Sequence, residues 1–267
     1  MATSILPILN YHGIRANDRD GFSAEERPYA VPLPHFEEQL SLLIQNGFQT
    51  LSLHELNNWL EGYGIKEKQM VITFDDGLIS QYEYAVPVLK ANQMKAIFLV
   101  SANLVGQNGF MNWIQLKELV RNGFDIGSHG LTHRPLSNVT HHELWKELYK
   151  SKSILEDKLG TKVTSFSVPR GYYQDRIREV ALEVGYRFVF TSRFDVNSSG
   201  ADRFRLNRIA IKNGLRPERF LKLLRGQLGY KRTLEKLKET ARNYIKPSFY
   251  DALAKFKRTV IEGEKEL

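Results

Sequence analysis

Cysteine is absent from the 267-residue chain, and this absence removes several classes of site at once. Disulfides, thiol redox centres and cysteine-based zinc sites are excluded, so any metal must be bound by histidine or by carboxylates. Long apolar runs are also missing, because no stretch approaches the roughly 20 residues of a membrane-spanning helix. Residues 1–10 lack the basic segment of a signal peptide, so we expect a cytoplasmic protein.

A strong excess of one charge is missing from most of the chain. Residues 1–215 hold 24 basic and 23 acidic residues, whereas residues 216–267 hold 14 and 7. The net charge of +8 therefore belongs mainly to the C-terminal segment. Because no nucleic-acid-binding motif accompanies it, no nucleic-acid partner is expected.

The C-terminal segment 216–267 has helical periodicity. Apolar residues recur at helical spacing on both sides of Pro247, which predicts two basic amphipathic helices within residues 230–262. We expect residues 216–267 to form a helical extension of a main domain that spans residues 1–215. These helices either pack on that domain or rest, as a peripheral contact, on the anionic inner face of a membrane.

Short apolar runs alternate with helical patterns through residues 1–215. Strands are expected at 5–10, 48–53, 70–74, 95–100, 124–128, 164–168, 187–191 and 206–211. Helices are expected at 35–46, 54–61, 80–92, 113–122, 141–159 and 174–184. This alternation predicts parallel strands with crossover helices, in one α/β barrel that is either complete or distorted.

Residues 70–77, Met-Val-Ile-Thr-Phe-Asp-Asp-Gly, place two carboxylates at the end of an apolar strand. Neighbouring side chains on an extended chain point in different directions, so one carboxylate can bind a metal while the other faces a substrate. Gly77 permits a sharp turn after Asp75 and Asp76. A plain strand-ending turn also explains an Asp-Gly pair.

Residues 128–133, Ser-His-Gly-Leu-Thr-His, follow another predicted strand. His129 and His133 are four residues apart, so a helical turn or a tight loop brings both imidazoles to one side. Alone, this pair is explained by surface or capping histidines. Together with one Asp, the two histidines make a three-ligand metal site with open positions for water and substrate.

Two further polar clusters also follow predicted strands. Residues 10–13 read Asn-Tyr-His-Gly, and residues 167–172 read Ser-Val-Pro-Arg-Gly-Tyr. The bend around Pro169 and Gly171 can point backbone N–H groups into a cleft, and Arg170 adds a positive charge. In a parallel α/β barrel the carboxyl ends of the strands share one face, where active sites lie. All four clusters are therefore expected on one catalytic face.

Thr-Phe-Asp-Asp-Gly followed by Ser-His-Gly-Leu-Thr-His resembles the polysaccharide deacetylase (NodB-homology) family, carbohydrate esterase family four, over residues 5–212. The resemblance implies a distorted (β/α) barrel with seven strands. It implies a hydrolase that removes N-acetyl groups from an amino-sugar glycan or glycolipid and releases acetate. It also implies a divalent metal on Asp76, His129 and His133, most often zinc, with cobalt, nickel or manganese as alternatives. Asp75 would be the general base.

Two later motifs depart from the family pattern. The third, usually Arg-x-Pro-Tyr-Gly, corresponds to residues 167–171, where Ser167 replaces the Arg that orients the base. The backbone N–H of Arg170 remains available for the oxyanion. The fifth motif has Arg208 in place of the histidine that acts as general acid. His12 is therefore expected to be the acid, because its context is similar to that of the poly-N-acetylglucosamine deacetylase branch.

Three other interpretations stay open. A different C–N hydrolase on the same barrel would act on a small amide or ureide. A non-catalytic glycan-binding or scaffold relative is favoured by the altered third and fifth motifs and opposed by the intact first two. A two-histidine, one-carboxylate iron oxygenase has the same ligand set, but its usual β jelly roll does not match the helical alternation.

Overall fold

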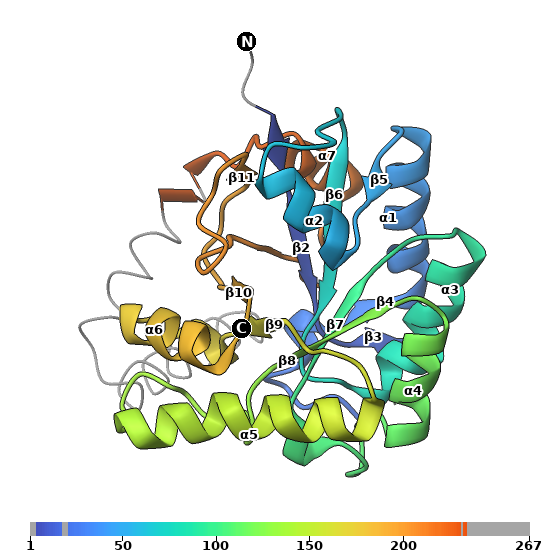
Figure 1. Ribbon diagram of the computed structural model, residues 1–267. Coiled ribbons are helices and arrows are strands. Elements are labelled where there is room, and N and C mark those ends of the chain that lie inside the picture. The colour runs from blue at the N-terminus through green and yellow to red at the C-terminus, as the bar shows by residue number, and fades with distance from the viewer. Residues whose placement is uncertain (1–3, 18–20, 231, 234–267) are drawn as a thin grey trace, which may run out of the picture.

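A curled sheet of parallel strands forms the centre of the molecule in the computed structural model, which describes residues 4–17, 21–230 and 232–233 (Figure 1). Its strand order is β10-β9-β8-β7-β6-β2-β12, and β5 pairs with the first two residues of β6. The strands are β2 (Ile8–Tyr11), β5 (Gln49–Thr50), β6 (Gln69–Phe74), β7 (Ile97–Val100), β8 (Asp125–Ser128), β9 (Ser165–Ser167), β10 (Phe188–Phe190) and β12 (Ile209–Ala210).

The two edges of this sheet approach each other. A parallel bridge joins Phe190, at the end of β10, to Leu206, in the segment that leads into β12. The seven main strands therefore form the distorted barrel that the sequence predicted. Two small pairs lie outside it: β1 (Ile5–Leu6) is antiparallel to β11 (Asn197–Ser198), and β3 (Ile14–Arg15) is parallel to β4 (Val31–Pro32).

Seven α-helices lie around the sheet in the described part of the chain. They are α1 (Leu33–Gln45), α2 (Leu53–Leu60), α3 (Val86–Ala91), α4 (Trp113–Arg121), α5 (His141–Leu159), α6 (Asp175–Val184) and α7 (Pro217–Leu224). Ser52, Asn112 and Thr140 each begin a helix with a complete capping box, which satisfies amide groups that the first turn leaves unpaired. In Figure 1, α1, α3 and α4 cover one side of the barrel and α5 the adjoining side.

The barrel interior changes from apolar to polar along the strands. Ile8, Val71 and Ile97 are fully buried in one apolar cluster, and each such side chain stabilises the fold by about 1.5–3 kcal/mol. The twofold alternation along β6 then points Thr73 and Asp75 in the same direction as Val71. Both are buried polar residues, so the carboxyl end of the barrel holds charge where the amino end holds hydrocarbon.

Helix α7 packs against α1, and its side chains Phe220, Leu223 and Leu224 are buried in the main core. It is the first part of the predicted extension 216–267. The two amphipathic helices expected within residues 230–262 lie outside the described residues, so the domain boundary at residue 215 stays a prediction. Among the described helices, none has the length and apolar character needed to cross a membrane.

Candidate metal centre

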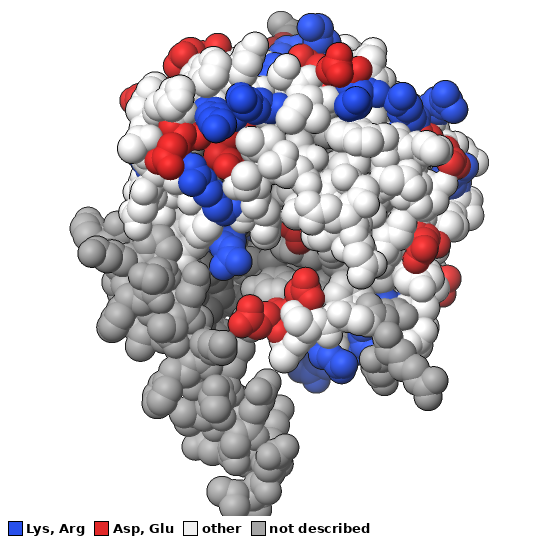
Figure 2. Space-filling view, turned by 90° about the horizontal axis from the view of Figure 1, so that it is seen from below, with Lys and Arg blue, Asp and Glu red and all other residues white. Residues whose placement is uncertain are grey.

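The catalytic residues expected from the sequence follow the strands at one end of the barrel. Asp75 and Asp76 follow β6, His129 follows β8, and His12 lies just beyond β2. Figure 2, which shows the molecule from below the view of Figure 1, looks onto this end, and the surface is hollowed near its middle with acidic side chains in and beside the hollow. The shared face predicted for these clusters is therefore present.

Asp76, His129 and His133 come together in a compact group. One ligand atom from each lies within 4.8 Å of the others. Asp76 Oδ1 is 3.3 Å from His129 Nε2 and 3.1 Å from His133 Nε2. This oxygen is buried and has no hydrogen-bond partner among the described residues. A buried, unsatisfied carboxylate oxygen facing two imidazole nitrogens fits a divalent cation, and a set of three protein ligands leaves positions open for water and substrate.

The backbone at two of these residues has unusual dihedral angles. Asp76 has φ 79° and His133 has φ 61°, in the left-handed region that non-glycine residues seldom adopt. Such conformations cost on the order of 1–3 kcal/mol and persist where the surroundings fix them. At Gly77, with φ 82°, a Cβ atom would come within 3.0 Å of Val100. The turn after β6 therefore needs glycine here to bring Asp76 toward the histidines.

Asp75 is buried and bound through both carboxylate oxygens. Arg208 Nη1 and Nη2 donate to Oδ1 and Oδ2, each at 2.7 Å. Asn10 Nδ2 donates to Oδ2 and Ser167 Oγ donates to Oδ1, both at 3.2 Å. Burial alone would raise the pKa of Asp75, but the positive charge of Arg208 and its hydrogen bonds to the carboxylate hold the pKa well below its usual range. Asp75 is therefore ionised and fixed in orientation.

Arg208 is the functional residue that sequence reasoning missed. It was identified only as a replacement for the usual acid, yet its guanidinium is buried and also donates through Nε to the carbonyl of Thr191 at 2.9 Å. It makes the contact with Asp75 that the family resemblance assigned to the missing Arg of the third motif. A signal was present in the sequence, since the third motif has lost an Arg and the fifth has gained one.

The pKa values of the two histidines of the group are shifted in opposite directions. Burial lowers the pKa of His129 to about 4, and the nearby Asp75 and Asp76 carboxylates oppose this only in part. His129 is thus a neutral imidazole, the form that binds metals. Its Nδ1 contacts the hydroxyl and the carbonyl of Ser167. Burial also opposes protonation of His133, but the adjacent Asp76 carboxylate raises its pKa overall.

His12 lies close to the aspartate pair. A positive charge on His12 would favour the ionised forms of both Asp75 and Asp76, and the His12 carbonyl accepts a hydrogen bond from Gln81 Nε2 at 3.0 Å. The same Gln81 nitrogen donates to the carbonyl of Asp75 at 2.5 Å. His12 Nδ1 is buried without a hydrogen-bond partner among the described residues, and its ring lies 5.1 Å from that of Tyr29.

Arg170 lies in a short 3-10 turn, Pro169–Gly171, where its φ is 57°. Its side chain is exposed, and its positive charge lowers the pKa of His133. The structure therefore places Arg170 beside His133, while Arg208 and Ser167 contact Asp75.

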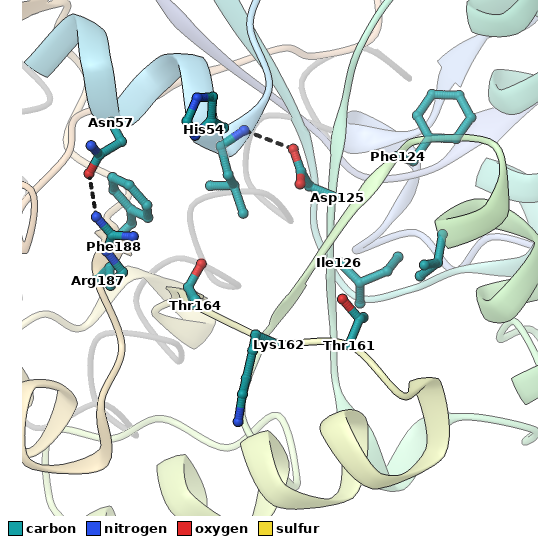
Figure 3. A pocket seen from close by; sticks show the side chains of 12 residues that line it. His54, Asn57, Phe124, Asp125, Ile126, Thr161, Lys162, Thr164, Arg187 and Phe188 are labelled. Carbon is teal, nitrogen blue, oxygen red and sulfur yellow. Dashed lines mark hydrogen bonds between the residues drawn. The ribbon is translucent and has the colours of Figure 1, made fainter.

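A separate pocket of about 380 Å³ lies at the opposite end of the barrel (Figure 3). It is lined by the start of α2 and by residues at the amino ends of β8 and β10, including Asp125 and Arg187. Asp125 accepts a hydrogen bond from the Leu53 amide at 2.8 Å, and Arg187 donates to Asn57 at 2.8 Å. None of the residues predicted to be catalytic or to bind metal lines this pocket.

Comparison with known proteins identifies related sequences. A family model described as polysaccharide deacetylase matches residues 63–189. YxkH of Bacillus subtilis (strain 168), which is named as a polysaccharide deacetylase, is 30% identical over 211 residues, covering 79% of this chain and 72% of that protein. A poly-beta-1,6-N-acetyl-D-glucosamine N-deacetylase of Staphylococcus aureus (strain N315) is 25% identical over 226 residues, covering 77% and 78%.

Two solved structures have the same architecture. The Streptococcus pyogenes deacetylase PplD, in complex with acetate, has a TM-score of 0.75 and 27% identity, covering 84% of this chain and 99% of that one. IcaB from Ammonifex degensii has a TM-score of 0.73 and 26% identity, covering 83% and 96%.

Proposed function

The chain belongs to the polysaccharide deacetylase family, and from this premise we propose that it is a metal-dependent hydrolase of N-acetylated amino sugars. It would remove N-acetyl groups from a glycan or glycoconjugate and release acetate. The observation that carries the proposal is the group of Asp76, His129 and His133 directly beside an ionised Asp75. Similarity to poly-beta-1,6-N-acetyl-D-glucosamine N-deacetylases supports an amino-sugar substrate.

Asp76, His129 and His133 would hold the ion, most often zinc, with cobalt, nickel or manganese as alternatives. When bound, such an ion supplies Lewis-acid chemistry, polarising the acetyl carbonyl and lowering the pKa of water to about 7. The donor set fits this role because His129 is neutral and Asp76 stays ionised. Burial would raise the pKa of Asp76, but the adjacent His133 outweighs burial and lowers it to about 2.

Asp75 would act as the general base and take a proton from the attacking water. Arg208, Ser167 and Asn10 hold both of its oxygens, so its direction is set before substrate arrives. The backbone N–H of Arg170 would stabilise the oxyanion of the tetrahedral intermediate. Loss of one such donor typically costs about 3 kcal/mol of transition-state stabilisation.

His12 would protonate the leaving amine, since an amine anion leaves too poorly without a proton. Its position near both aspartates supports this role. Arg208 is unsuited to it, because a guanidinium does not release a proton near neutral pH and this one is bound to Asp75.

The test combines metal analysis with acetate release from β-1,6-linked N-acetylglucosamine oligomers, N-acetylchitooligosaccharides and an N-acetylglucosaminyl lipid. We expect about one divalent ion per chain, acetate from at least one of the sugars, and loss of both in Asp76→Ala. Full activity after complete metal removal would refute the proposed chemistry. Acetate from simple amides alone would favour the other C–N hydrolase, and metal binding without any turnover would favour the scaffold interpretation.

A further inference from the structure

Residues 130–132 form the loop between His129 and His133, and hydrogen bonds from other elements of the fold fix its conformation. On one side, the segment after β7 binds its carbonyls: the amides of Ala102 and Asn103 donate to the carbonyls of Gly130 and Leu131, each at 3.0 Å. Two positive φ angles occur in and directly after the loop, 80° at Gly130 and 61° at His133. The segment after β7 therefore binds only carbonyls of the loop, and the Leu131 and Thr132 amides bind an acceptor elsewhere.

Glu147, on helix α5, binds those amides. Its Oε2 accepts hydrogen bonds from the Leu131 amide at 2.9 Å and from the Thr132 amide at 3.0 Å. Its Oε1 accepts from Thr132 Oγ1 at 2.7 Å and lies 3.4 Å from Arg134 Nε. Glu147 is only 4% exposed. Burying a carboxylate is unfavourable unless hydrogen bonds and an opposite charge compensate for the lost water, and here both are present.

From these contacts we propose that Glu147 is a positioning residue for the metal centre. It fixes the loop in which His129 and His133 face each other, with ring centroids 5.0 Å apart. Without this carboxylate, the buried Leu131 amide and the partly buried Thr132 amide lose their acceptor, and the loop must shift to reach water or another acceptor. A shift of the loop would move His133 away from Asp76 and loosen the ligand geometry. The inference rests on the proposed metal-dependent function, since it concerns the same site.

The experiment measures zinc affinity of the metal-free protein by competition with a chromogenic chelator, in parallel with thermal unfolding. Loss of a residue that orients metal ligands typically weakens metal binding by about 10- to 100-fold, and we expect this range for Glu147→Ala. Glu147→Gln should give a smaller loss, because its amide oxygen can still accept a backbone hydrogen bond while the charge is gone. This conservative variant also guards against misfolding of the alanine variant.

Leu144→Ala is the matched control, because Leu144 is buried on the same helix and its apolar side chain accepts no hydrogen bond. It should lower the unfolding temperature and leave the zinc dissociation constant unchanged. Wild-type zinc affinity in both folded Glu147 variants, or an equal loss in Leu144→Ala, would overturn the role of Glu147. Zinc binding by Asp76→Ala as tight as in the wild type would instead overturn the metal site itself, so the two failures are distinguishable.

Discussion

Asp75 and Asp76 are neighbours in the chain, yet their side chains have different partners. Asp75 contacts Arg208, Ser167 and Asn10, whereas Asp76 faces the two histidines. Adjacent side chains on extended backbone diverge, and the positive φ of Asp76 turns its carboxylate toward the loop 129–133. One sequence motif therefore places one carboxylate against Arg208 and the other against the two histidines, as the proposed division of roles requires.

This division predicts different outcomes for two isosteric substitutions. Asp75→Asn should lower kcat by at least about 10²- to 10⁴-fold, the range of general-base catalysis, and leave metal content near the wild-type value. Asp76→Asn should lose the metal, because an amide is a weaker ligand than a carboxylate. Elemental analysis of both purified variants, together with an acetate-release assay, distinguishes loss of the metal from loss of catalysis. Equal metal loss in the two variants would show that the roles are not divided in this way.

Arg208 gives a second prediction at this scale, which concerns pH. Because Arg208 holds the pKa of Asp75 low, Arg208→Lys, which keeps a charge but cannot make both hydrogen bonds, should raise that pKa. Asp75 would then become protonated at higher pH, so the acid limb of the kcat/KM profile should move upward. Arg208→Met should also lose about 3–5 kcal/mol of unfolding free energy, since it leaves a buried carboxylate unpaired.

The control for Arg208 is Arg187→Lys, a surface arginine at the other end of the barrel that donates to Asn57. Its pH profile should match that of the wild type. An acid limb that stays in place in Arg208→Lys would mean that Arg208 does not set the pKa of the base.

His12 gives the third prediction. If it protonates the leaving amine, His12→Ala should lower kcat by roughly 10²- to 10⁴-fold while metal content is preserved. Substrates with a better leaving group need less protonation, so the defect should shrink on an N-acetyl aryl amide relative to an N-acetyl sugar. His35→Ala, which alters an exposed histidine at the start of α1, serves as the control. Near-normal kcat in His12→Ala would leave the proton donor unassigned.

At the scale of elements, the sequence predicted strands and helices where apolar periodicity is local. The expected helices 113–122, 141–159 and 174–184 correspond to α4, α5 and α6 within a residue or two. The expected helix 80–92 instead begins with a π-turn, Gln81–Ala85, because Pro87 has no N–H to donate into the preceding turn. Periodicity does not show such a local change in hydrogen bonding.

The expected strand 206–211 shortens to β12, Ile209–Ala210, for a different reason. The segment before β12 pairs with the end of β10, where Leu206 N donates to Val189 O and Thr191 N donates to Leu206 O. It then turns so that Arg208 points into the barrel toward Asp75. The conformation of this segment depends on its pairing with β10, where the two edges of the barrel meet. No local pattern in residues 203–210 predicts that pairing.

The capping box of α5 gives a prediction at the element scale. The Thr140 side chain accepts from the Glu143 amide, and the Glu143 side chain accepts from the Thr140 amide. Thr140→Ala should lower the free energy of unfolding by about 1 kcal/mol, or the melting temperature by roughly 2–4 °C. Zinc affinity should not change, because Glu147 lies beyond the first turn.

Ser153→Ala, at an exposed position inside α5, is the matched control, and alanine should leave stability unchanged or slightly raised there. Differential scanning calorimetry on the three proteins makes the comparison. A Thr140→Ala protein as stable as the wild type would show that the rest of the packing, and not the cap, determines this helix end.

At the scale of the whole molecule, the sequence predicted the barrel and its catalytic face but not the contacts across it. Four polar clusters at strand ends were enough to place Asp75, His12 and the two histidines together. The pairing of Asp75 with Arg208 joins positions 133 residues apart, and the bond from Ser167 spans 92 residues. Which polar side chains meet across a barrel depends on strand order and closure, so the structure was needed to pair them.

The last prediction concerns residues 230–262, which carry basic amphipathic patterns and, apart from residues 230, 232 and 233, lie outside the described part of the chain. We predict that this segment binds anionic membranes, where each Lys or Arg near the surface contributes about 1 kcal/mol and salt screens the attraction. The 267-residue protein should sediment with phosphatidylglycerol vesicles at low salt and dissociate from them at high salt. It should not sediment with phosphatidylcholine vesicles. Replacing Lys236, Lys238 and Arg242 with Gln should weaken binding, whereas Lys90→Gln on α3 should not. If the wild-type protein stays in solution with anionic vesicles at low salt, residues 230–262 do not form a membrane-binding surface, and the expected contact with the inner face of a membrane is wrong.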